Sequence, residues 1–226
     1  MEVQIVHRPG NSAAQVRLGP TESITSEGGA MIAMSGDMRI ETTTHKKKGK
    51  GSILKAAKRL LSGESFFLNH FTAGAQGGDL WLATTLPGDM LVYDLQQENL
   101  IVQGGSYVAS EPQVEIDLGW QGFKTVLSGE SLFWLHLNGS GKVILNSFGA
   151  IYQVPVKGEY IVDTGHVVAF QETLDFEITK AGKSWMSSFL GGEGLVCRFK
   201  GQGMLWCQSH NPPGFGKALG PKLRPR

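Results

Sequence analysis

The heptapeptide Leu-Ser-Gly-Glu-Ser-Phe-Phe occupies residues 61–67, and Leu-Ser-Gly-Glu-Ser-Leu-Phe occupies residues 127–133. A third version, Leu-Gly-Gly-Glu-Gly-Leu-Val, occupies residues 190–196. The glutamates of the three copies are Glu64, Glu130 and Glu193. A motif that returns at such a regular distance indicates that the chain is built from three diverged copies of one unit.

A second motif recurs in the same order. Gly-Ala-Met-Ile-Ala at residues 29–33 returns as Gly-Ser-Tyr-Val-Ala at 105–109 and as Gly-His-Val-Val-Ala at 165–169, each ahead of its glutamate. A third element is interpreted as the opening of each unit: Pro-Gly-Asp at 87–89, Lys-Gly-Glu at 157–159 and, more weakly, Gly-Pro-Thr-Glu at 19–22. The motifs together predict three repeats.

The repeats define the expected domain organisation. Residues 1–212 are expected to form a single compact body, with repeats at about 3–85, 86–152 and 153–212. Residues 213–226 are rich in proline, glycine and basic residues, and we expect a flexible tail there.

Within each repeat the pattern is that of short strands. Residues 114–118 and 174–178 alternate apolar and acidic side chains, which is typical of half-buried strands. The Gly-x-Gly sequences at 139–141 and 201–203 predict turns between strands. Only residues 52–61 have apolar side chains at helical spacing, and they predict one short amphipathic helix. The expected fold class is therefore all-β.

Three small units have marginal cores alone, so they should pack on one another. A linear arrangement would leave two sheet edges exposed to unwanted pairing. We therefore expect the units to be related by a pseudo-threefold axis.

Hydrophobic residues make up 41% of the chain and charged residues 18%, as in a compact folded protein. No stretch is long and apolar enough for a signal peptide or a membrane span. The cytoplasm is the expected compartment. A cytoplasmic chain keeps its thiols reduced, so Cys197 and Cys207 are expected to be buried free thiols.

Several matching stretches, taken together, resemble the altered-inheritance-of-mitochondria family. They are residues 62–65, 86–89, 101–103 with 109–110, 189–197 and 208–212, and the likeness covers residues 3–212. The resemblance implies a β-sandwich or double-stranded β-helix fold of the kind grouped with the tryptophan RNA-binding attenuator protein (TRAP-like). It implies no enzymatic activity, and it links eukaryotic members to mitochondrial inner-membrane organisation. Because the chain has no Arg-rich presequence, a bacterial-type member is expected.

The glycine-glutamate corners are the sharpest candidate site: Gly63, Glu64, Gly129, Glu130, Gly192 and Glu193. Three converging carboxylates would bind a hard cation. The alternative, which we favour, is that each glutamate accepts hydrogen bonds from backbone donors of its own turn. No metal and no cofactor is therefore expected.

Catalytic patterns are absent from the sequence. His70 and His136 each follow their glutamate by six residues, but Phe199 occupies that place in the third repeat, so a symmetric metal shell would be incomplete. The chain contains no nucleophile elbow, no Walker motif and no dinucleotide fingerprint. We do not expect an enzyme.

The favoured function is a non-enzymatic interaction or scaffold protein with an unknown protein partner, and a homo-oligomer is one form it would take. The alternative is a binding module for nucleic acid or an acidic membrane surface. That module would use a basic segment at residues 46–59, formed by Lys46, Lys47, Lys48, Lys50, Lys55, Lys58 and Arg59.

Overall fold

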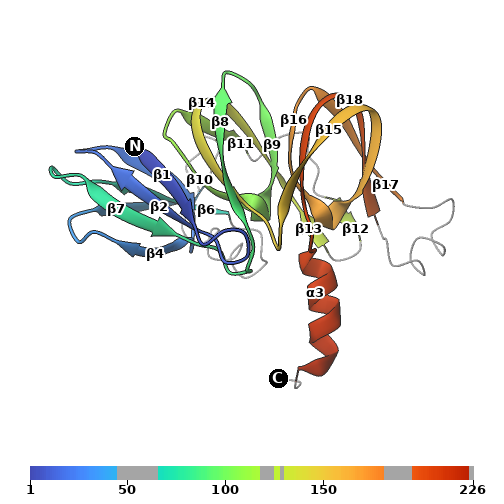
Figure 1. Cartoon of the computed structure of the whole chain (residues 1–226), viewed down its shortest axis with the longest axis horizontal. Coiled ribbons are helices and arrows are strands. Elements are labelled where there is room, and N and C mark those ends of the chain that lie inside the picture. Colours follow the sequence, from blue (N-terminus) through green and yellow to red (C-terminus); the bar gives the residue numbers. More distant parts are fainter. Residues whose placement is uncertain (45–65, 118–124, 128–129, 181–194, 224–226) are drawn as a thin grey trace.

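The computed structural model describes residues 1–44, 66–117, 125–127, 130–180 and 195–223. They form antiparallel β-sheets with one short α-helix, which confirms the predicted all-β class (Figure 1). The helix expected at residues 52–61 lies outside the described residues. We call β1–β7 the first unit, β8–β14 the second and β15–β18 the third; they follow one another from left to right in Figure 1.

The first unit contains seven strands: β1 (Glu2–Val6), β2 (Ala13–Leu18), β3 (Ser23–Glu27), β4 (Met31–Met34), β5 (Arg39–Thr44), β6 (Phe67–Thr72) and β7 (Gly78–Leu82). The second contains β8 (Met90–Gln96), β9 (Leu100–Gln103), the 3-10 turn η1 (Gly104–Ser106), β10 (Tyr107–Ser110), β11 (Val114–Asp117), β12 (Thr125–Leu127), β13 (Glu130–Leu132) and β14 (Trp134–Asn146). The third contains β15 (Ile151–Asp163), η3 (Thr164–His166), β16 (Val167–Gln171), β17 (Leu174–Lys180) and β18 (Leu195–Gln208).

One pairing scheme occurs in all three units. In the first, β6 pairs with β3 and β5, while β7 pairs with β2 and β4. In the second, β14 takes both places: its first half pairs with β9 and β11, its second half with β8 and β10. In the third, β18 pairs in the same way with the two halves of β15, with β17 and with β16. Each unit is thus a pair of small sheets. The central strands of the two sheets are β6 and β7 in the first unit and the two halves of one long strand, β14 or β18, in the other units.

The same irregularity also recurs at the second sequence motif. The register shifts between Met31 and Ala33 in β4, between Tyr107 and Ala109 in β10, and between Val167 and Ala169 in β16. A β-bulge adds one residue to a strand and bends it locally. Because the bulge falls on the same motif position three times, it gives a residue-by-residue correspondence: Ile32 matches Val108 and Val168.

The structure corrects the predicted turns at residues 139–141 and 201–203. Both triplets lie inside continuous strands, β14 and β18. Gly139 has φ +103° and Gly201 has φ +118°, a backbone conformation that other residues rarely adopt. A Cβ on Gly139 would also press against the carbonyl of Gln113. The glycines therefore bend one strand from the first small sheet into the second, where sequence alone favoured a turn.

The prediction that Pro-Gly-Asp at 87–89 and Lys-Gly-Glu at 157–159 open equivalent repeats was wrong. Residues 87–89 precede the first strand of the second unit, whereas Gly158 lies in the middle of β15, paired with Gly201. Gly158 therefore corresponds to the turn between β2 and β3, as residues 19–22 do. The local chemistry of Pro-Gly-Asp and Lys-Gly-Glu is alike, but their places in the pairing scheme differ.

Consecutive units join through strand pairing. In β10 of the second unit, Ala109 lies opposite Ser26 of β3, and in β16 of the third, Ala169 lies opposite Val102 of β9. Among the strands that the structure describes, no pairing joins β4 to β15. The pseudo-threefold arrangement is therefore not confirmed.

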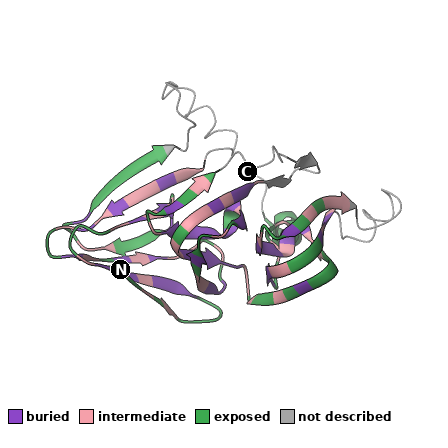
Figure 2. Ribbon diagram, turned by 90° about the horizontal axis from the view of Figure 1, so that it is seen from above, coloured by how far each residue is buried: buried purple, intermediate pink, exposed green. Residues whose placement is uncertain are grey.

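Three hydrophobic clusters form the core, and they cross the unit boundaries. The first cluster, mainly from the first unit, includes Val108 and Ala109 of β10. The second, mainly from the second unit, includes Val168 and Ala169 of β16. The following unit thus helps to complete the core of the unit before it, which is why buried stretches lie where the units meet and exposed stretches lie toward both ends (Figure 2).

Both cysteines, Cys197 and Cys207, are buried and free, as predicted. Burial raises the pKa of Cys207 to about 12 and raises that of Cys197 further. A thiol with so high a pKa is protonated at neutral pH, so neither cysteine is a nucleophile in the folded chain.

The segment expected to be a flexible tail carries helix α3 (Pro212–Leu219), followed by η4 (Gly220–Lys222). Asn211 caps α3 by accepting a hydrogen bond from the Gly214 amide at 2.6 Å, and prolines occupy its first positions. The helix extends away from the sheets (Figure 1), and none of its residues is buried.

Candidate interaction surface

Most of the residues predicted as a site lie outside the described residues. This holds for Gly63, Glu64, Gly129, Gly192 and Glu193, and for the seven basic residues of the segment at 46–59. Glu130 is placed as the first residue of β13. The expectation that each glutamate accepts hydrogen bonds within its own turn, and that the three do not form a cation site, therefore stays a prediction.

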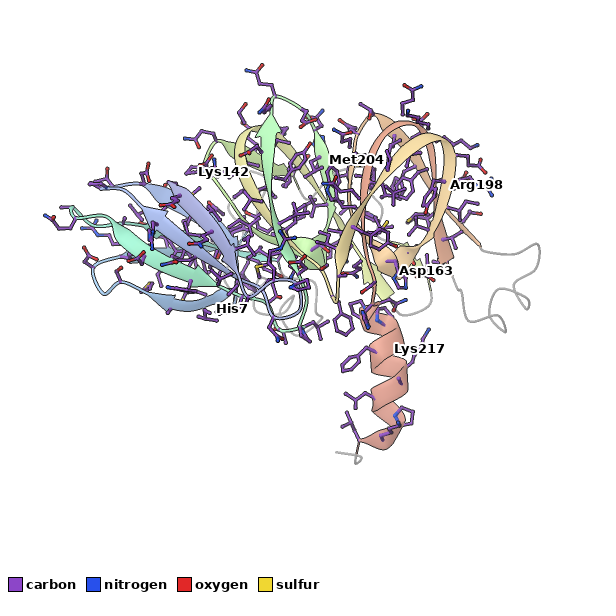
Figure 3. The ribbon with its side chains drawn as sticks, in the orientation of Figure 1. His7, Lys142, Asp163, Arg198, Met204 and Lys217 are labelled. Carbon is purple, nitrogen blue, oxygen red and sulfur yellow. The ribbon has the colours of Figure 1, made fainter. Side chains whose placement is uncertain are left out.

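Within the described residues, no group of three or more His, Cys, Asp or Glu side chains gathers as metal ligands would. His70 hydrogen-bonds the hydroxyls of Thr25 and Thr43, at 2.9 and 2.8 Å. His136 contacts Glu172 at 3.4 Å. The pairing also corrects the comparison of repeats: the third-unit residue that matches His70 and His136 is Arg198, opposite Ile161, rather than Phe199. Figure 3 shows Arg198 toward the right-hand end of the molecule.

A shallow groove of about 440 Å³ lies between the second and third units, beside Met204 in Figure 3. The Tyr93 and Trp206 rings meet edge to face there, with centroids 5.1 Å apart. The Tyr93 hydroxyl donates to Glu98 at 2.5 Å, and Gln171 donates to the same carboxylate at 3.1 Å. Burial, reinforced by that hydrogen bond to Glu98, raises the pKa of Tyr93. The ring contact between Tyr93 and Trp206 and the hydrogen bond from Gln171 to Glu98 cross the unit boundary, so the polar and aromatic groups at the groove hold the two units together.

Among the described residues, two sheet edges have a paired strand on one side only. β4 pairs with β7 on one side, and its residues from Met31 to Ala33 are exposed. Residues 159–163 of β15 pair with β18 on one side, and Tyr160 and Ile161 are exposed. We call these two stretches the β4 edge and the β15 edge.

The corresponding strands inside the chain are more deeply buried. Ile32 is 58% exposed, while its counterparts Val108 and Val168 are 0% exposed. Ile161 is 50% exposed, while its counterpart Ile101 is 0% exposed. The two edges thus carry apolar side chains of the kind that the internal junctions bury. Sequence reasoning missed them, and the only available signal was that residues 31–34 of a strand motif contain no charge.

Glu27, at the end of β3, carries a half-buried carboxyl group whose pKa burial raises to about 7. The folded state therefore favours the protonated form, and the unfolded chain ionises nearer 4.5. Because the folded state binds more protons between pH 4.5 and 7, the free energy of unfolding falls as pH rises through this window and is level above it. A shift of this size corresponds to roughly 3 kcal/mol.

We expect Glu27→Gln to raise the free energy of unfolding at pH 8 by roughly 2 kcal/mol, with a smaller gain at pH 5. Urea unfolding at both pH values measures this difference. Glu115→Gln, on the exposed side of β11, is the matched control and should leave stability within about 0.5 kcal/mol. An equal gain from Glu27→Gln at both pH values would contradict the assignment.

Comparison with known proteins gives consistent matches along the chain. The model of the family described as mitochondrial biogenesis AIM24 matches residues 3–210. The uncharacterized protein M6_Spy0233 of Streptococcus pyogenes serotype M6 is 28% identical over 202 residues, which cover 87% of this chain and 81% of that protein. The crystal structure of protein SPYM3_0169 from Streptococcus pyogenes superposes with a TM-score of 0.81 at 26% identity, covering 98% of this chain and 99% of the other. Across the described residues, no helix has the length and apolar character that crossing a membrane requires.

Proposed function

This chain belongs to the AIM24 family as a bacterial-type member, and from that premise we propose that it is a non-enzymatic interaction protein that binds through its two open sheet edges. The observation that carries the proposal is the exposure of Ile32, whose counterparts Val108 and Val168 are fully buried, together with the exposure of Ile161, whose counterpart Ile101 is fully buried. An edge strand offers a row of unpaired backbone donors and acceptors to any strand of a partner.

The composition of the edges favours a binding role. Natural proteins protect an exposed edge with charged side chains, prolines or bulges that turn it away. The β4 edge consists of Met-Ile-Ala-Met and carries no charge. On the β15 edge, the acidic Glu159 and Asp163 stand only at the two ends of an apolar run. β4 contains a bulge, but the same bulge in β10 and β16 does not prevent those strands from pairing, so both edges suit apolar strand addition.

The non-enzymatic part of the proposal is supported by the chemistry of the described residues. The two cysteines are held as thiols by their raised pKa values, and the groove beside Tyr93 uses its polar groups to join two units. Two free thiols also fit a reducing compartment, which supports the cytoplasm as the place of action. The alternative of an anionic partner depends on residues 46–59, outside the described residues, and stays a prediction.

Site-specific photo-crosslinking in cells tests the proposed function. A photoreactive side chain in place of Ile32 or Ile161 should give discrete covalent adducts, identified by mass spectrometry, because both positions would lie inside a contact. Ile40 of β5 is the matched control: it is 40% exposed and lies on an edge strand whose counterparts β11 and β17 are edges too. Adducts no more abundant at 32 and 161 than at 40 would reject the proposal.

A further inference from the structure

We propose that residues 211–226, which we call the α3 segment, bind the headgroup layer of a membrane that contains anionic lipid. The segment lies outside residues 3–210, the part of the chain that the AIM24 family model matches. The proposal uses neither the two open edges nor the basic segment at residues 46–59. It is carried by an exposed apolar stripe on α3 and by the uniform positive charge of the same segment.

The stripe consists of Phe215, Leu219 and Leu223, which follow one another at intervals of four residues. Their exposed fractions are 46%, 39% and 61%. Residues four apart lie on the same side of a helix, so Phe215 and Leu219 face the same way. Lys217 is two residues from Phe215, about 200° round the helix, and therefore lies on the opposite side. α3 is thus amphipathic, with an apolar and a basic side.

The base of α3 is held in place, so the stripe has a defined direction. The Phe215 ring meets the Phe148 ring edge to face, with centroids 5.5 Å apart. The backbone carbonyl of Asn211 accepts a hydrogen bond from the Phe215 amide at 3.0 Å, and its side-chain amide donates to Asp163 at 3.4 Å. Beyond this base α3 extends away from the sheets (Figure 1), and none of the residues of α3 or η4 is buried. The described sheets therefore leave most of the stripe uncovered.

All charged side chains of the α3 segment are positive. Lys217 and Lys222 belong to its described part, and the sequence adds Arg224 and Arg226. The whole chain has 21 Lys and Arg and 20 Asp and Glu; without the four cations of the segment, 17 basic and 20 acidic residues remain, a net charge of −3. Figure 3 shows Lys217 pointing away from α3. The segment is therefore a basic projection on an acidic body, and it attracts an anionic partner.

An anionic lipid surface fits both properties of the segment. The lipid phosphates attract the basic side chains, and the boundary between headgroups and acyl chains receives the apolar ones. Nucleic acid also attracts basic side chains, but its phosphate backbone gives no apolar layer for the exposed Leu219 and Leu223. The headgroup layer is thus the partner whose chemistry matches the charge and the stripe together.

Sedimentation with lipid vesicles tests the proposal on the purified full chain. We expect the wild type to bind vesicles of phosphatidylcholine mixed with phosphatidylglycerol, and to bind pure phosphatidylcholine vesicles at least about tenfold more weakly. Leu219→Gln combined with Leu223→Gln should weaken binding to the mixed vesicles by about tenfold, because the stripe then loses its outer part. This variant keeps the contact of Phe215 with Phe148, so the base of α3 is unchanged.

The charge is tested by a second pair of substitutions. Lys217→Gln combined with Lys222→Gln should weaken binding to the mixed vesicles by at least about tenfold, because each basic side chain near an anionic surface strengthens binding about fivefold. The matched control is Lys157→Gln combined with Lys200→Gln, which removes the same charge from exposed positions of β15 and β18 and should bind as the wild type does. Circular dichroism confirms that all variants are folded.

A fluorescent label distinguishes insertion into lipid from a purely polar contact. Cys197 and Cys207 are 0% and 1% exposed, so an environment-sensitive maleimide dye on the Leu223→Cys variant reacts at the new position. Its emission should shift to shorter wavelength when the mixed vesicles are added, because position 223 enters the apolar boundary of the headgroup layer. The same dye on the Ile40→Cys variant, in β5 of the first unit, should not respond.

Three outcomes overturn the inference: a wild type that does not bind the mixed vesicles at low salt, binding that the two leucine substitutions leave unchanged, or a dye at position 223 whose emission does not shift. Retention on RNA that requires the lysines but not the leucines, without binding to vesicles, would assign the segment to nucleic acid instead. Each of these results leaves the proposed function intact, because crosslinking at positions 32 and 161 tests the open edges alone.

Discussion

Replacing Asp89 by alanine is expected to lower the free energy of unfolding by about 3 kcal/mol, because it removes the centre of a buried polar cluster. Arg8 donates two hydrogen bonds to the Asp89 carboxylate, each 2.8 Å long, and Ser12 donates a third at 3.0 Å. The Met90 amide donates a fourth at 2.8 Å. Asp89 is only 4% exposed, so its loss leaves the buried Ser12 and Met90 donors without their acceptor, while the half-exposed Arg8 side chain loses its ion pair.

Urea unfolding of Asp89→Ala at pH 7 measures this loss, and Asp94→Ala provides the matched control. Asp94 lies on β8, which begins at the residue after Asp89, and it pairs with Lys142 at 3.5 Å, but both side chains are well exposed. An exposed ion pair contributes about 0–1 kcal/mol. Equal effects of the two substitutions would contradict a special role for the buried cluster.

The pH dependence of Asp89→Ala separates the charge from the packing. Burial raises the pKa of Asp89, but the hydrogen bonds from Arg8, Met90 and Ser12 outweigh it and hold the pKa below the ordinary 3.8. The stabilisation by Asp89 is therefore fully present above pH 3.8 and is lost as pH falls through the lowered value. The gap between wild type and Asp89→Ala should narrow in that acid range.

Gly88→Ala is expected to cost roughly 3 kcal/mol, for a steric reason. A Cβ on Gly88 would overlap the carbonyl oxygen of Ser147, which is backbone and cannot rotate away. Overpacking costs about 1–3 kcal/mol, and the shift would also strain the hydrogen bond from the Ser12 amide to the Gly88 carbonyl. For a chain of this length, the melting temperature should fall by roughly 6–12 °C.

Gly10→Ala is the control for Gly88→Ala. A Cβ on Gly10 would meet no atom within 4 Å, so its stability should change by less than about 1 kcal/mol. Differential scanning calorimetry compares the two variants under one condition. Equal melting temperatures of the two variants would contradict the close contact between the Gly88 backbone and the Ser147 carbonyl.

The two largest predictions concern one place, where the residues just before β2, β8 and β15 meet. The Ser12 amide donates to the Gly88 carbonyl at 3.0 Å, and the Asp89 amide donates to the Gly149 carbonyl at 2.9 Å. Nothing in Pro-Gly-Asp as a sequence distinguishes it from Lys-Gly-Glu at residues 157–159. Its role as a junction depends on residues about 60 or more positions away, which no local pattern encodes.

Several elements followed directly from local pattern. The alternation at residues 114–117 gave β11, with Val114 buried and Glu115 exposed, because a strand turns successive side chains to opposite faces. The histidine comparison failed at the third unit by one residue, Phe199 in place of Arg198. Arg198 lies five residues after Glu193, whereas His70 and His136 lie six residues after their glutamates. Counting along the chain therefore selects the wrong residue, and only the strand pairing identifies the equivalent one.

The sequence by itself determined that the chain is rich in strands and that one motif is used three times. Only the tertiary structure decided how far the equivalent residues of each copy are buried. Ile32, Val108 and Val168 occupy the same place in the same motif, yet the first is exposed and the other two are fully buried. Burial depends on whether another strand lies alongside, which is a contact between distant parts of the chain. For this reason two of the three equivalent strands became internal junctions and the third became an open edge.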